Sequence, residues 1–152
     1  MSQTVIVVVE GKGSQPYPPD LNPEVPGCDY GNVLARLMKP LDALAAAHGI
    51  PALSLFVFTD PELLQPLLDE LAGEAKAKVE RVLASQQEWH PVDQALRSVD
   101  SFLGLLAAPA DPADPLLSSL RLGGTLAPLI WDLRALRHVL QESNARFHLE
   151  AL

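Results

Sequence analysis

The sequence predicts an α+β fold that is mainly α, with four or five packed helices and two or three short strands. Two observations lead to this prediction. The 152-residue chain is 48% hydrophobic but only 5% aromatic, so Leu, Ala and Val must fill most of its interior, as is typical of packed helices. Long stretches also repeat apolar residues at helical spacing, whereas only short ones have strand character. The length fits a single globular domain spanning residues 1–152, and no internal repeat divides it.

The N-terminal part begins with a β-branched run from Thr4 to Val9, which predicts a buried strand that stops near Gly11. Five of the fourteen prolines then fall between Pro16 and Pro26. Because proline lacks an amide hydrogen, we expect an extended surface loop or arm at about 11–31. The spacing Pro16-Tyr17-Pro18-Pro19 could serve as a polyproline ligand, but we expect Tyr17 to pack on the protein's own surface.

Helical periodicity starts at residue 32 and continues to His48, and Pro40 within it predicts a kink or two short helices. The apolar run at 52–58 predicts a second strand, although an extended segment buried among helices would have the same pattern. Capping residues and first-turn prolines predict further helices at 61–84, 91–107 and 115–122. Pro66 and Gly73 make the first of these less regular. Alternation over 146–150 predicts a last strand, which could pair beside Val5–Val9.

The last predicted helix, about 126–144, carries two faces. Its apolar stripe is formed by Leu126, Leu129, Ile130, Leu133, Leu136 and Leu140. Trp131 falls on the opposite side, in line with Ala135, His138 and Glu142. A large aromatic side chain there needs a cover, so these four residues form a candidate partner-binding face, with a cover from this chain as the alternative.

Trp89 differs from Trp131, because it precedes the helix start at His90-Pro91. In that position an aromatic side chain commonly packs on the first turns of the helix, here on Val92 and Ala95. We therefore expect Trp89 to be a structural anchor.

Composition excludes several classes of function. The formal net charge is −8, the pI is near 4.8, and no basic tract is present, so nucleic acid and anionic membranes are poor partners. Cys28 is the single cysteine, which fits a reducing compartment. The N-terminus has no signal-peptide pattern and no run long enough to span a membrane. We expect a cytoplasmic protein.

No motif assembles a catalytic, cofactor or metal site. The four histidines are scattered, and the His138–Glu142 spacing is what any helix surface produces, so we predict no metal and no cofactor. Cys28 lies beside Asp29, whose negative charge disfavours a thiolate. The segment Gly11-Lys12-Gly13-Ser14 lacks the spacing of a phosphate-binding loop. The carboxylates between residues 60 and 88 form a solvated helix face, and Asp93, Arg97 and Asp100 form a ladder that predicts a salt-bridge cluster.

Three segments in order resemble small bacterial proteins of uncharacterised function: Phe56-x-Phe58-x-Asp60, the run Glu88 to Leu96, and Arg146-Phe147-His148-Leu149 after an apolar helix. The resemblance covers roughly the C-terminal two-thirds of the chain and leaves the Pro-rich arm outside. None of its motifs is catalytic, so it implies a structural framework and no activity.

Two hypotheses of function follow. The first is a non-enzymatic protein-binding or regulatory protein, which acts through self-association or in an inhibitory complex of the toxin-immunity type. The second is a small-molecule or enzymatic site between the Pro-rich arm and the helices, with Asp29, His90, Asp93 and His138 as candidates. Convergence of these side chains in one cleft would favour the second hypothesis.

Overall fold

The computed structural model of the chain describes residues 4–17, 30–107 and 126–151. Within these ranges it contains six α-helices, one 3-10 helix and a three-stranded antiparallel sheet. The predicted α+β class, mainly α, is therefore confirmed. Most of the Pro-rich segment, including Cys28 and Asp29, and the helix predicted at 115–122 lie outside the described residues.

The sheet places strand β1 (Val5–Val9) between β2 (Gly13–Gln15) and β3 (Phe147–Ala151). The predicted pairing of the first and last strands is confirmed, with Val7 opposite Leu149. β2 is a correction, because residues 13–15 were expected to belong to a loop. Gly11 and Gly13 have positive φ, which allows a tight turn in which the Lys12 N–H donates to the Val9 carbonyl at 3.0 Å.

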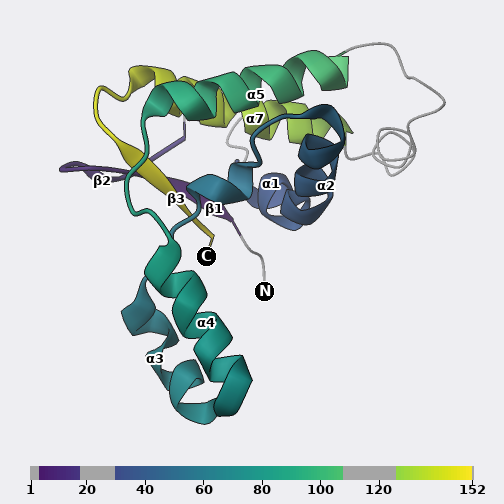
Figure 1. Ribbon diagram of the computed structural model, residues 1–152. Coiled ribbons are helices and arrows are strands. Elements are labelled where there is room, and N and C mark those ends of the chain that lie inside the picture. The colour runs from purple at the N-terminus through teal and green to yellow at the C-terminus, as the bar shows by residue number, and fades with distance from the viewer. Residues whose placement is uncertain (1–3, 18–29, 108–125, 152) are drawn as a thin grey trace.

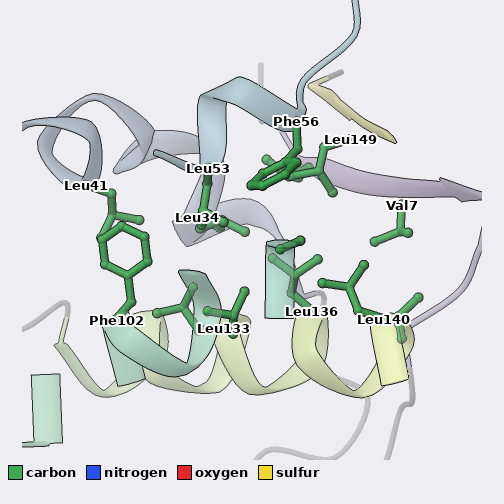
Figure 2. Packing of buried hydrophobic residues seen from close by; sticks show 14 of the residues in the cluster. Val7, Leu34, Leu41, Leu53, Phe56, Phe102, Leu133, Leu136, Leu140 and Leu149 are labelled. Carbon is green, nitrogen blue, oxygen red and sulfur yellow. The ribbon is translucent and has the colours of Figure 1, made fainter. Parts of the chain in front are cut away.

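The hydrophobic core lies between one face of this sheet and the helices. Helices α5 (Val92–Ala107) and α7 (Leu126–Glu142) pack side by side, and α7 also contacts β1 (Figure 1). Figure 2 shows the leucines of α7 meeting side chains from the sheet and from α1, α2 and α5. The stripe predicted on α7 is mostly confirmed, since Leu129, Leu133, Leu136 and Leu140 are buried while Leu126 and Ile130 are half-buried.

Helices α1 (Asn32–Arg36) and α2 (Met38–His48) replace the single helix pattern at 32–48. The break falls at Leu37 and leaves Pro40 in the first turn of α2, where its missing amide hydrogen costs little. Gly31 precedes α1 with φ 96°, and a Cβ there would lie 2.6 Å from the Val5 carbonyl oxygen. Only glycine allows β1 and α1 to approach so closely.

The strand predicted at 52–58 is wrong. The 3-10 helix η1 (Leu53–Phe56) occupies this segment and buries Leu53 and Phe56, because a spacing of three residues puts both on one side of a 3-10 turn. Val57 alone forms an isolated bridge, with Leu149 of β3.

The helix predicted at 61–84 is two helices, α3 (Pro61–Glu70) and α4 (Gly73–Ser85), which turn at Gly73 with φ 63°. They pack chiefly on each other and project from the rest of the molecule (Figure 1). We call α3 and α4 the hairpin, and the sheet with α1, α2, η1, α5 and α7 the body.

Candidate functional site

The face predicted around Trp131 is only partly open. Trp131 is half-buried, and the Arg134 guanidinium lies 5.0 Å from the centroid of its ring. His138 and Glu142 are exposed. Ala135 is completely buried by this chain itself, so a partner cannot contact its side chain. The face available to a partner therefore consists of Trp131, His138 and Glu142 without Ala135.

A groove of about 580 Å³ runs beside this face, between α5 and α7. Leu103 and Ile130 line it together with polar residues of both helices. The Arg137 Nε donates to the Asp100 carboxylate at 2.5 Å across it. Asp100 thus pairs with α7, and the expected salt-bridge cluster of Asp93, Arg97 and Asp100 does not form among these described residues.

The candidate pocket residues of the second hypothesis do not converge among the described residues. His90 is buried, whereas Asp93 is exposed and lines a shallow cavity beside Arg146. His138 lines the α5–α7 groove. Asp29 lies outside the described residues.

His90 lies where the chain returns from the hairpin to the body. Its backbone pairs with Phe147 of β3, and its ring Nε2 lies 3.1 Å from the Gln87 carbonyl. The ring meets Phe56 edge-on at 5.1 Å. Burial lowers the pKa of the His90 imidazole below its ordinary value of 6.5, and the neighbouring His148 lowers it further, although the Gln87 contact opposes both. The neutral ring is therefore favoured.

His148 is the centre of the hairpin's attachment. Its ring lies 4.7 Å from the Trp89 ring and 5.1 Å from the Phe58 ring. Its Nδ1 donates to the Glu88 carbonyl at 2.9 Å, because a carbonyl can only accept, and its Nε2 pairs with the Glu150 carboxyl group at 2.8 Å. β3 thus holds the chain on both sides of the hairpin. The predicted contact of Trp89 with Val92 and Ala95 stays a prediction.

A second clamp closes the base of the hairpin. The Gln86 side chain accepts from the Thr59 N–H at 3.0 Å and donates to the Thr59 carbonyl at 2.5 Å. Its amide thus satisfies both backbone groups of one residue. The Asp60 carboxylate accepts from the Glu62 N–H at 2.9 Å and caps α3 as its sequence predicts. The entry and exit of the hairpin are therefore fixed to each other.

A large open cavity of about 1020 Å³ lies at this base, between α4, η1 and the start of α5. We call it the root cavity. Leu55 and Val82, whose side chains are 62% and 60% exposed, line it from the body and the hairpin respectively. His90 and Arg97 also line it.

The hairpin's own surface is mostly exposed. α4 has no buried residue, and Leu68 is the buried residue of α3 among those whose side chains are described. Leu67, one position away, is 48% exposed. Between residues 60 and 85 six carboxylates outnumber three cations; they are Asp60, Glu62, Asp69, Glu70, Glu74 and Glu80 against Lys76, Lys78 and Arg81. The hairpin is therefore acidic, with an apolar side chain on its flank.

Sequence reasoning missed the root cavity. Arg97 looked like a partner of Asp100 on the same helix, and only the position of α7 shows where Asp100 pairs. Leu55 lay in a segment predicted as a buried strand, and the 3-10 turn that exposes it has no distinct sequence signal. Val82 gave no distinct signal either, because other apolar residues, such as Val79 and Leu83, stand beside it in the same predicted helix.

Comparison of the chain with protein-family models, curated proteins and solved structures finds no match. The resemblance to uncharacterised bacterial proteins thus stays a prediction. Among the residues that the structure describes, no helix is long and apolar enough to cross a membrane, and no group of three or more His, Cys, Asp or Glu side chains is placed to hold a metal ion.

Proposed function

We propose that this protein is a non-enzymatic binding protein whose hairpin docks on a basic surface of a protein partner. The observation that carries the proposal is that α3 and α4 project from the body while their sides stay exposed. A hairpin with so little burial adds little to a core, although Gln86, Trp89 and His148 hold its base in place. An element that is held at its base and free along its sides suits recognition.

The chemistry of the hairpin indicates the partner. Six carboxylates against three cations favour a positively charged surface, and complementary charge raises the association rate. Leu67 would enter an apolar pocket and supply affinity. A second copy of the chain is disfavoured, since both copies carry a formal charge of −8. An inhibitory complex of the immunity type, in which an acidic protein neutralises a basic one in the cytoplasm, is a concrete version of this proposal.

The open part of the α7 face is proposed as a second contact for the same partner. Trp and Arg are the residue types most enriched among binding hot spots, and Trp131 with Arg134 provides both. His138 and Glu142 border it.

Site-specific photo-cross-linking tests the proposal. The photoreactive residue p-benzoylphenylalanine would replace Leu67, Trp131 or, as a control, the exposed Lys39 of α2, in cells that produce the protein. We expect one defined product from position 67 that position 39 does not give and that added salt weakens. The proposal is contradicted if position 39 gives the same cross-linked product, or if the product joins two copies of this chain.

Matched variants then test the anchor. Leu67→Asp should weaken binding of the identified partner at least tenfold, because it removes the apolar contact. Ala77→Asp adds the same charge at an exposed position of α4 and should leave affinity nearly unchanged. Equal losses in the two variants would mean that Leu67 is not an anchor.

A further inference from the structure

The root cavity has the size and lining of a small-molecule site. Its volume of about 1020 Å³ lies at the upper end of the range for ligand pockets. Its walls combine apolar side chains with a few polar groups, as such pockets do. Leu55 on η1 and Val82 on α4 both line the cavity and are exposed, so an apolar molecule bound there would cover both.

The charge of the cavity is unusual for this chain. The sequence holds 19 Asp and Glu residues, yet no carboxylate is found among the described residues that line the cavity. Arg97 is the charged residue among them, because the neutral form of His90 is favoured. An anion would therefore meet attraction and no close repulsion from these residues.

Arg97 is also available to a ligand. Its guanidinium forms no hydrogen bond or ion pair with another described side chain, and the neighbouring Asp100 is occupied by Arg137. A guanidinium binds a carboxylate with two parallel hydrogen bonds, which fixes its orientation as well as its charge.

We propose that the root cavity binds an amphipathic organic anion, with its apolar body between Leu55 and Val82 and its carboxylate on Arg97. This site is distinct from the Leu67 anchor proposed for the hairpin, because Leu67 is not among the residues that line the cavity, although Val82 of α4 is. The two proposals can therefore fail independently.

Titration with decanoate and with decanol tests the proposal on the full chain. The two probes share an apolar body and differ in charge. By calorimetry we expect decanoate to bind at least tenfold more tightly than decanol, because only decanoate can pair with Arg97. In NMR spectra decanoate should shift the amide signals of Leu55, Val82 and Ala151. Equal affinities, or shifts confined to the α5–α7 groove, would overturn the proposal.

Variants separate the site from general charge. Arg97→Gln should weaken decanoate binding about tenfold and leave decanol binding unchanged. Arg81→Gln removes an exposed cation of α4 that is not among the lining residues, and it should bind decanoate as the parent does. If both variants lose the same affinity, the anion is attracted by overall charge and the proposed contact is wrong.

A membrane surface presents similar chemistry, so vesicles of phosphatidylcholine and phosphatidylglycerol complete the test. Protein that stays in solution when the vesicles sediment supports a monomeric ligand. Protein that sediments with them contradicts it.

Discussion

The body and the hairpin of this chain bury their apolar side chains to very different extents. The body surrounds a continuous cluster that includes Val7, Phe102 and Leu136, all fully buried (Figure 2). The hairpin buries Leu68 and leaves Leu67 and Val82 exposed. Stability depends on apolar area removed from water, so most of it resides in the body. The hairpin is therefore held mainly at its base, and most of its side chains stay exposed to solvent.

The largest effect should come from the centre of the body. Phe102→Ala removes a fully buried aromatic ring between α5 and its neighbours, and we expect it to lower the free energy of unfolding by about 3–5 kcal/mol. Urea denaturation followed by circular dichroism measures this loss. Leu68→Ala in the hairpin is the matched comparison, and an equal loss there would contradict the division between body and hairpin.

A polar contact inside the body should come next. The buried Asp132 carboxylate of α7 accepts from the Leu34 N–H at 2.9 Å and caps α1, whose own N-cap Gly31 has no side chain to do so. Asp132→Ala should cost about 2 kcal/mol, because buried amides of α1 lose their acceptor. In urea denaturation, a loss of unfolding free energy below about 0.5 kcal/mol would contradict this role, because surface substitutions usually have effects of that size.

The same carboxylate predicts a dependence on pH. Burial raises the pKa of Asp132 above its ordinary value of 3.8, although backbone donors from Leu34, Gly31 and Val33 oppose the rise. The folded protein then holds this proton more tightly than the unfolded chain does. The contribution of Asp132 to the unfolding free energy is therefore largest below 3.8 and is lost as pH rises through the folded pKa. Asp132→Asn should remove this dependence of the unfolding free energy on pH. Urea denaturation at several values between about pH 3.5 and 6.5 would measure it, because this range begins near the ordinary pKa of an aspartate.

The base of the hairpin should give a smaller, local effect. Gln86→Ala removes both hydrogen bonds to Thr59 and should cost about 1 kcal/mol. Hydrogen exchange should become faster in α3 and α4 and stay unchanged in α5 and α7. Gln87→Ala, which removes one exposed hydrogen bond to Trp89, is the control. Faster exchange throughout the body would show that the two regions unfold together.

The smallest effect should fall on the hairpin's flank. Leu67→Ala shortens a side chain that is 48% exposed and should change the unfolding free energy by less than about 0.5 kcal/mol. A loss above about 2 kcal/mol is typical of a buried leucine and would mean that Leu67 belongs to a core. The proposed docking surface would then lose its anchor.

The sequence allowed much of the body to be predicted, because its signals are local. The apolar run at Val5–Val9 and the alternation at 146–150 predicted two strands and their pairing. The helical stripe of α7 was predicted in the same way. Pro40 predicted a kink or two short helices at 32–48, and α1 and α2 are two helices, although they divide at Leu37. The strand at 52–58 failed because a short apolar run has no period that separates a strand from a buried 3-10 turn.

The attachment of the hairpin could not be predicted, because it depends on contacts between distant segments. Alternation made His148 a polar position of the last strand and gave no sign of its neighbours, yet the rings of Trp89 and Phe58 lie against it. Trp89 had a sufficient local explanation and therefore concealed this contact. Similarly, Gln86 pairs with Thr59 across 27 positions, and nothing in the sequence links these two residues.

The central position of β1 has a consequence for synthesis of the chain. β1 leaves the ribosome early, yet its partner β3 spans Phe147–Ala151, and the Asp132 cap of α1 is made almost as late. The side chains of β1 cannot be fully buried until these later segments have been synthesised; they are Val5, Val7 and Val9. By contrast, α3 and α4 contact each other over a short sequence distance and can form as soon as both have been synthesised. We expect the hairpin to fold first and the body to close in a late step, with apolar strand surface exposed to chaperones in between.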